Sequence, residues 1–478
     1  MLTKLFLPGK LHRILFAIFI FSLPLVNAIV HGDGVGYYAY ARAPLIQHNF
    51  HFEEDWRHAN LYFSQSRTRP DGQLLPEEYT ETGYVANLFT VGPALLWFPF
   101  LLLAHICVQL LDLFGMQIPA DGFSFPYIFA MALGTAIYGF LGLLFSFRLA
   151  KKYIAERWAL LATIAIWWAS SLPVYMYFNP AWSHALSAFA VSFFAWFWDR
   201  TRNARTTSQW IALGLIAGMM MDIYFPNSIF LLLPLSESLL KYFNKSQHAA
   251  AKILFAQNLL FTVTTVIAFL PTILTRRIIF GGYFRFGAYS HISWDWTAPH
   301  WRVVLFSSDH GLFSWTPILA VALIGIFFIP HAFRILAIYF ALVVIAFYYL
   351  ISSYPFWDGM SSFGNRFFIS LTPIYVFGLA ALMQRCALLF SSPRSALLTY
   401  SAVITCFVIW NLGFIYQWGA HLIPARGPIS FREAAYNQLW VVPHKFSGHL
   451  RAYIFDRNQL MQQIEQKDIE QLKNGGQR

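Results

Sequence analysis

The stretch LHRILFAIFIFSLPLVNAIVHGDGVGYY, residues 11–38, joins a long apolar run to a carboxylate. The run covers residues 11–30. Lys10 directly precedes it, and Arg13 lies near its start. About 20 apolar residues cross the hydrocarbon core of a bilayer, so the stretch predicts a first membrane helix with Asp33 just beyond it. A charge at the edge of a membrane is costly unless it is solvated or paired, which makes Asp33 a candidate functional residue. The alternative is an ordinary loop at the membrane interface.

The composition of the whole chain supports a membrane class. Of its 478 residues, 58% are apolar and only 12% are charged, whereas a soluble globular protein is about 25% charged. The net charge of +11 is explained by loops that keep Lys and Arg on the cytoplasmic side of a membrane. We expect no nucleic-acid binding, because the sequence shows no basic stripe and no module signature.

The distribution of apolar segments predicts an all-α bundle of about 11 transmembrane helices. The apolar segments lie near residues 11–30, 125–147, 158–177, 182–198, 209–225, 227–240, 253–273, 311–330, 335–354, 367–385 and 397–417. Connections rich in Lys and Arg occur at residues 148–157, 199–205, 241–245, 331–334 and 383–394. All of these connections fall on the cytoplasmic side if the N-terminus is cytoplasmic and only one more crossing separates Ala28 from Arg148.

This topology leaves no crossing for the apolar stretch at residues 86–111. We therefore expect an interfacial or re-entrant pair of helices there, broken at Gly92-Pro93 and at Pro99, because proline interrupts helical hydrogen bonding. The alternative is that this stretch spans the membrane and another segment does not. The predicted organisation is a membrane domain over residues 1–417, whose first outer loop (31–124) carries interfacial helices, and an amphipathic tail over 418–478.

Polar side chains gather in the four regions that this topology places outside, at residues 31–124, 178–184, 274–310 and 355–366. These regions contain Asp33, Glu53, Glu54, Asp55, His184, Arg276, Arg277 and Arg366. Secondary transporters place their sites at mid-membrane on broken helices, whereas here the charged groups would meet at the outer interface. Such a site suits a substrate whose lipid part stays in the bilayer and whose polar head protrudes.

Several motifs recur in an order and spacing typical of one family. They are HGDGVGYYAYAR (31–42), TGYVANLFTVGPALLWFPF (82–100), NPAWSHALSAF (179–189), HGLFSWTPILA (310–320), FWDGMSSFGNRF (356–367) and FREAAYNQLWVVP (431–443). Over most of its length the chain resembles bacterial GT-C glycosyltransferases, membrane enzymes that take sugars from polyprenyl-phosphate donors. The branch it resembles most is related to protein O-mannosyltransferases and to the aminoarabinose transferases of lipid A.

The resemblance implies a catalytic carboxylate after the first helix, and Asp33 occupies that position. It would orient the acceptor hydroxyl, or accept its proton, in an inverting displacement whose leaving group is the lipid phosphate. His184 stands where several relatives have an aspartate, and it would assist the acceptor or the leaving group; the alternative is a helix-end histidine bonded to a carbonyl. Cations would stabilise the departing phosphate, with Arg366 the first candidate and Arg276 and Arg277 the second.

In many relatives a second acidic residue lies later in the first loop, where this chain has Glu53, Glu54 and Asp55. Some members of the superfamily use a divalent metal at the acidic site, and Asp33 with Glu53 or Asp55 would supply its carboxylates. Nothing in the sequence requires a metal. The chain departs from its relatives at Asp222, inside an apolar segment where they often have an arginine nearby, and this carboxylate needs a partner in the bundle.

These observations predict a glycosyltransferase of the bacterial inner membrane whose site lies on the periplasmic face. Its partners would be a polyprenyl-phosphate sugar and an acceptor that is a lipid-linked glycan, a lipopolysaccharide or a protein. A lipid-glycan transporter or flippase without transferase chemistry is the alternative, and it requires charged groups at mid-depth in the bilayer. A polymerase that joins glycan repeats would share the outer-face site.

Overall fold

The computed structural model describes residues 9–58, 67–69, 71–243, 251–285 and 292–475. Its α-helices are α2 (Lys10–Ser22), α3 (Asp33–Arg42), α4 (Glu53–Arg57), α6 (Gly92–Leu113), α7 (Phe125–Lys151), α8 (Glu156–Trp168), α9 (His184–Thr201), α10 (Thr207–Ile223), α11 (Leu232–Phe243), α12 (Ala251–Phe280), α13 (Trp301–Phe306), α14 (Leu312–Trp315), α15 (Ile318–Ile324), α16 (Arg334–Ser352), α17 (Thr372–Cys386), α18 (Pro393–Gly419), α19 (Phe431–Tyr436), α20 (Val442–Phe455) and α21 (Arg457–Gly475). Within the described residues the only β pairing consists of two isolated bridges in the first loop. The all-α prediction is confirmed.

Helix length and hydropathy support a multi-pass membrane protein but not the count of 11. In the described ranges, six helical segments are long and apolar enough to cross a bilayer: 92–113, 125–151, 251–280, 331–352, 366–389 and 393–419. Several other expected spans fold as shorter helices. The segment expected at 158–177, for example, divides into α8 and the short helix η4 (Val174–Phe178). The first apolar run likewise forms α2, followed by one 3-10 turn, Leu23–Leu25.

The prediction of a broken helix pair at residues 86–111 is wrong. Gly92–Leu113 is one continuous helix of 22 residues, with Pro93 in its first turn and Pro99 in its interior. Proline is tolerated in the first turn of a helix because that N–H has no partner in any case. At Pro99 one backbone hydrogen bond is lost, and the surrounding apolar helix continues through it. This helix is among those long enough to span.

The basic connections meet at one end of the bundle, here called the basic end. Lys152 Nζ lies 2.7 Å from an Asp199 carboxylate oxygen, and Lys241 donates to the Arg202 carbonyl at 3.2 Å. The Ala155 N–H donates to the side chain of Gln384 at 2.7 Å, and the rings of Tyr153 and Phe333 lie 4.7 Å apart. The five connections that the charge pattern placed on one side of a membrane are therefore neighbours; residues 244–245 of one connection lie outside the described residues.

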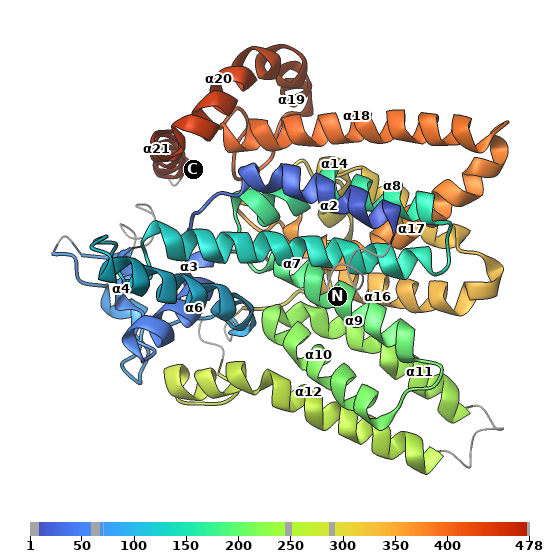
Figure 1. Ribbon diagram of the computed structural model, residues 1–478, viewed down its shortest axis with the longest axis horizontal. Coiled ribbons are helices and arrows are strands. Elements are labelled where there is room, and N and C mark those ends of the chain that lie inside the picture. The colour runs from blue at the N-terminus through green and yellow to red at the C-terminus, as the bar shows by residue number, and fades with distance from the viewer. Residues whose placement is uncertain (1–8, 59–66, 70, 244–250, 286–291, 476–478) are drawn as a thin grey trace.

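The opposite end of the bundle, here called the Asp33 end, carries the residues of the predicted site. Helix α7 runs across the view in Figure 1 from its start near α3 to the basic end. Its start is fixed by the Tyr38 hydroxyl of α3, which donates to the Gly122 carbonyl at 2.6 Å. Helix α9 and the segment 366–389 also begin at the Asp33 end. Helix α9 and the segment 366–389 thus present their first residues to one site, and α7 passes beside it, where the Thr135 hydroxyl donates to the Pro180 carbonyl at 2.8 Å.

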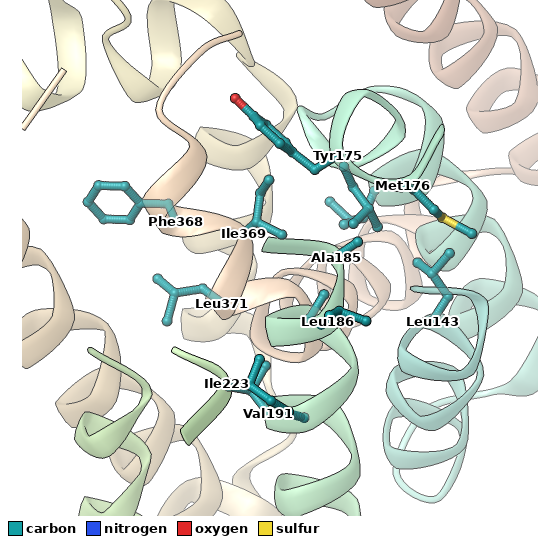
Figure 2. Close-up of a cluster of buried hydrophobic side chains, with 14 of the residues drawn as sticks. Leu143, Tyr175, Met176, Ala185, Leu186, Val191, Ile223, Phe368, Ile369 and Leu371 are labelled. Atoms are coloured by element: carbon teal, nitrogen blue, oxygen red, sulfur yellow. The ribbon is translucent and has the colours of Figure 1, made fainter. Parts of the chain in front are cut away.

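A shared hydrophobic core holds these helix starts in place. Figure 2 shows Ala185 and Leu186 of α9 beside Ile369 and Leu371 of the 3-10 helix η10 (Arg366–Leu371). All four side chains are almost completely buried. His184 and Arg366 directly precede these core segments in the chain, so the core sets where both polar side chains emerge. In a core packed this closely, a substitution that changes the side-chain volume by even one methylene group disturbs the neighbouring residues.

The tail after residue 417 folds into helices that attach to the Asp33 end. The Tyr453 hydroxyl of α20 donates to the Leu25 carbonyl at 2.8 Å, and the Arg457 guanidinium donates to the carbonyls of Pro24 and Val26. The Ile429 N–H also reaches the Ser308 carbonyl at 3.4 Å. The tail therefore lies on the same end as Asp33, although its amphipathic contact with a membrane surface stays a prediction.

Candidate functional site

Two glycines allow the first residues of α3 to pack against the turn before α9. Gly32 has φ of +55°, and Asp33 is the first residue of α3. A Cβ on Gly34 would lie 2.5 Å from the Cβ of Ala181, far inside van der Waals contact. Glycine therefore serves both as the turn with positive φ and as the site of close approach. The two glycines on either side of Asp33 thus allow the chain there to pack closely against Ala181 and Trp182.

Asp33 forms an ion pair with Arg366. A carboxylate oxygen of Asp33 lies 2.8 Å from Nη2 of Arg366, and the side chains are 35% and 7% exposed respectively. The two residues are 333 positions apart in the chain, so only tertiary folding brings them together. The partly exposed carboxylate remains accessible, while the arginine behind it is almost completely covered.

Aromatic side chains surround the Arg366 guanidinium. Its Cζ lies 4.2 Å from the centre of the Trp182 ring and 5.5 Å from that of Phe367. The Trp182 indole is itself fixed, because its N–H donates to the His31 carbonyl at 2.9 Å. Within the described residues, Nε and Nη1 of Arg366 have no hydrogen-bond partner. A buried cation with unused N–H groups attracts an anion, because the desolvated charge is only partly compensated.

His184 lies in an aromatic pocket beside this pair. Its ring centre is 5.0 Å from that of Tyr175, 5.5 Å from Tyr224 and 6.2 Å from Phe367. The side chain is buried, and its Nδ1 has no hydrogen-bond partner among the described residues. The alternative of a helix-end histidine whose Nδ1 is bonded to a carbonyl is therefore not what the structure shows. His184 thus has a ring nitrogen available next to the Asp33–Arg366 pair.

The three acidic residues of the first loop lie away from Asp33. Asp55 makes a bidentate pair with Arg42, with N–O distances of 2.6 and 2.7 Å, and Glu54 lies 3.4 Å from the same guanidinium. Arg42 is the last of the ten residues of α3 and Asp33 the first, which separates their backbones by about 14 Å. Glu53 is on the same short helix as Asp55, and its carboxylate lies 3.7 Å from Nδ1 of His51, which precedes that helix. In the described residues Asp55 and Glu54 thus contact Arg42 rather than Asp33, and a metal held by Asp33 with Glu53 or Asp55 stays a prediction.

Arg276 and Arg277 are also occupied elsewhere. The Arg276 guanidinium donates to the carbonyls of residues 87, 88 and 89, which anchors the chain just before α6. Arg277 donates to the Gly281 carbonyl at the end of its own helix. Of the cations predicted to meet a phosphate, Arg366 alone is paired with Asp33 in the described part of the chain. The sequence showed only that both arginines end an apolar run, which does not distinguish a ligand contact from a backbone clamp.

Asp222 lies nearer the site than its apolar segment suggested. It is fully buried and is the last residue but one of α10. The main chain of Asp222 packs against Gly92 at the start of α6, and Tyr224 two residues later contacts His184. Asp222 therefore lies at the end of α10, beside the start of α6 and close to the residue that contacts His184.

Three polar residues near Arg366 were not among the site residues predicted from the sequence. Ligand atoms of Asp309, His310 and Asp358 all lie within 4.8 Å of one another. Burial lowers the pKa of His310 to about 4, and burial with the nearby Asp358 raises the pKa of Asp309. His310 begins the motif HGLFSWTPILA, Asp309 directly precedes it, and Asp358 lies in FWDGMSSFGNRF, but no spacing rule links His310 with Asp358, 48 residues later.

Comparison with known proteins gives distant structural neighbours. No family model and no curated protein matches the sequence. An archaeal oligosaccharyltransferase, AglB from Archaeoglobus fulgidus in complex with an inhibitory peptide and a dolichol-phosphate, is similar with a TM-score of 0.44 and 13% identity over 91% of this chain. The apo form of the Archaeoglobus fulgidus oligosaccharyltransferase gives 0.45 and 14% over 92%. The chain spans 54% and 55% of the length of these two proteins.

Proposed function

We propose that this protein is a membrane glycosyltransferase that moves a sugar from a polyprenyl-phosphate donor to a hydroxyl of a lipid or protein acceptor. The observation that carries the proposal is the ion pair between Asp33 and the buried Arg366 at one end of a membrane helix bundle. It joins a partly exposed carboxylate to a cation with unused N–H groups. Glycosyl transfer from a lipid phosphate needs such a base and such a cation side by side.

The proposed reaction is a single displacement with inversion. The acceptor hydroxyl oxygen attacks the anomeric carbon, its proton passes to the Asp33 carboxylate, and the bond between that carbon and the phosphate oxygen breaks. The electron pair leaves with the polyprenyl phosphate. Arg366 orients Asp33 through their ion pair, and its positive charge stabilises the departing phosphate. General-base catalysis of this kind contributes about 10²–10⁴-fold to the rate.

His184 takes part in the proposal through its unbonded Nδ1 beside the same pair. A neutral imidazole there accepts a hydrogen bond from a substrate hydroxyl. The rings around it provide flat apolar surfaces of the kind that pack on sugar rings, and they exclude water from the reacting groups. The lipid chain of the donor would remain in the bilayer, which requires the Asp33 end to face the membrane surface opposite to the basic end.

The test is turnover by purified protein with radiolabelled polyprenyl-phosphate sugars, with a hexose and a pentose as alternative donors. Asp33→Asn removes the base while preserving size, and we expect a loss of about 10²–10⁴-fold in kcat. The matched control is Glu81→Gln. It removes a carboxylate from an exposed ion pair with Arg285, whose N–O distance of 3.2 Å is similar to the 2.8 Å between Arg366 and Asp33. Full activity of Asp33→Asn would refute the assignment.

The cellular counterpart of this test is lipid extraction from a deletion strain. We expect an accumulated polyprenyl-phosphate sugar and an under-glycosylated acceptor, which together identify both substrates. Localisation to a bacterial inner membrane with a periplasmic site belongs to the same proposal. It predicts that a cysteine introduced near Asp71, which is exposed in the first loop, reacts with an impermeant thiol reagent in intact spheroplasts.

A further inference from the structure

A second cluster of ionisable side chains lies beyond Arg366, formed by two separate loops. Asp309 and His310 come just before α14, and Asp358 lies in the loop after α16. The three ligand atoms lie within 4.8 Å of one another, and Asp309 Oδ1 is 3.5 Å from His310 Nδ1. Among the described residues this is the one group of three or more His, Cys, Asp or Glu side chains with such spacing.

The burial of His310 distinguishes this cluster from an ordinary group of acidic residues at a protein surface. Its side chain is completely buried, and neither ring nitrogen has a hydrogen-bond partner in the described chain. The adjacent Asp309 Oδ1 is also buried; it faces His310 Nδ1 at 3.5 Å and has no hydrogen-bond partner among the described residues. Leaving a buried polar atom without a hydrogen bond costs about 1–3 kcal/mol. A ligand that contacts His310 and the loosely paired Asp309 Oδ1 would therefore stabilise the fold.

The backbone of His310 adds to this cost. Its φ is +55°, the left-handed region, which a residue with a Cβ seldom adopts. Gly359, next to Asp358, has φ of +71° and lies close enough to Arg366 that a Cβ on it would be 3.3 Å from the guanidinium Nε. In these two loops the strained residues are His310 and Met360, which is next to Gly359 and also has φ of +55°; strained residues of this kind cluster at functional sites.

The chemistry of the three side chains selects the ligand. An imidazole and two carboxylates offer one nitrogen and two oxygens, a donor set that suits Zn²⁺ or Mn²⁺, whereas Mg²⁺ and Ca²⁺ prefer oxygen alone. Ligand atoms about 2.1 Å from a metal in tetrahedral geometry lie about 3.4 Å from one another. The 3.5 Å between Asp309 Oδ1 and His310 Nδ1 is close to this separation, and the Asp358 ligand atom lies within 4.8 Å of the other two.

We propose that Asp309, His310 and Asp358 bind one divalent transition-metal ion. The ion joins the loop before α14 to the loop that ends in Arg366, and two carboxylates balance its charge. The site thereby fixes the segment that positions Arg366 against Asp33. It differs from a metal at Asp33 itself, and it does not depend on the proposed glycosyl transfer.

The experiment measures binding of the metal alone to the full chain. The protein, purified through a tag without histidine and treated with EDTA, is titrated with ZnCl₂ and MnCl₂ by calorimetry, and metal content is measured after gel filtration. We expect about one ion per chain. His310→Gln and Asp358→Asn should each weaken binding at least tenfold, since loss of supporting residues alone costs about 10–100-fold.

The matched control is the partly exposed pair of His300 and Asp295, whose N–O distance is 3.1 Å and which belongs to no group of three such ligands among the described residues. The double variant His300→Gln/Asp295→Asn should bind the metal as the natural chain does. Because His310→Gln replaces a buried residue and its failure to fold would be uninformative, Asp358→Asn and the absorption spectrum of Co²⁺ bound to the unaltered chain give independent readings. Absence of a stoichiometric ion, or binding unaffected by Asp358→Asn, would overturn the proposal.

Discussion

Replacing Asp55 with asparagine separates a structural role from a substrate-binding role in the first loop. Asp55 is buried, and both of its oxygens are bonded to Arg42. Removing one partner of a buried, hydrogen-bonded ion pair costs about 3–5 kcal/mol, because the remaining charge is left uncompensated. The Asp55→Asn protein should therefore unfold more readily, while any molecule that remains folded keeps its substrate affinity.

The expected size of the effect follows from the length of the chain. An unfolding entropy of about 2.1 cal/mol/K per residue amounts to about 1 kcal/mol/K for 478 residues. A loss of 3–5 kcal/mol then lowers Tm by about 3–5 °C, which tryptophan fluorescence or a thiol-dye melt resolves. Glu53→Gln, on the same helix but outside the bidentate pair, should change Tm by less than about 1 °C.

A double variant strengthens the reasoning. Arg42→Met/Asp55→Leu removes both charges, and well-packed apolar replacements of a buried ion pair are often neutral. We expect Tm to return most of the way toward its original value. If Asp55→Asn raises KM for the lipid-linked sugar and leaves Tm unchanged, Asp55 binds substrate and the structural interpretation is refuted.

Three further substitutions test the packing around the site. Gly34→Ala places a Cβ 2.5 Å from that of Ala181, so we expect a cost of about 1–3 kcal/mol and at least a tenfold fall in kcat; an unchanged Tm would show that the contact is not tight. Arg457→Ala removes the charged donor that holds the tail to Val26, a loss of about 1.5–3 kcal/mol in docking, and limited proteolysis should cleave the tail faster. Arg276→Gln should increase hydrogen exchange of residues 87–91 without raising KM for the donor, because its hydrogen bonds go to backbone carbonyls; a higher KM with unchanged exchange would instead indicate phosphate binding.

Hydropathy and charge predicted the class and the two ends of the molecule. The low charge content and the repeated apolar runs indicated a helical membrane protein, because only helices or closed barrels satisfy backbone groups in lipid. The positions of Lys and Arg predicted which connections share a side, and contacts such as Lys152 with Asp199 confirm that they meet. Element boundaries were less predictable, since turns such as Val174–Phe178 interrupt runs that are continuous in hydropathy.

The partners of each charged residue could not be derived from sequence. Asp33, His184 and Arg366 were singled out by their places in motifs, and the fold brings them together. Asp55 and Arg276 looked equally suitable by composition, yet each forms contacts that depend on the path of a distant segment. A charged side chain at the end of an apolar run has the same local pattern whether it binds substrate or anchors the backbone.

The amino-acid sequence was sufficient to predict an all-α membrane bundle, because hydrophobic length and loop charge are local properties. Asp33 was singled out as a candidate base by the family resemblance of the motif that contains it. Tertiary structure was needed to pair Asp33 with Arg366, to assign Asp55 to Arg42, and to bring His310 beside Asp358. These pairings depend on side-chain packing between helices far apart in the chain. Steric fit and the cost of burying an uncompensated charge select them, and neither is visible in a linear pattern.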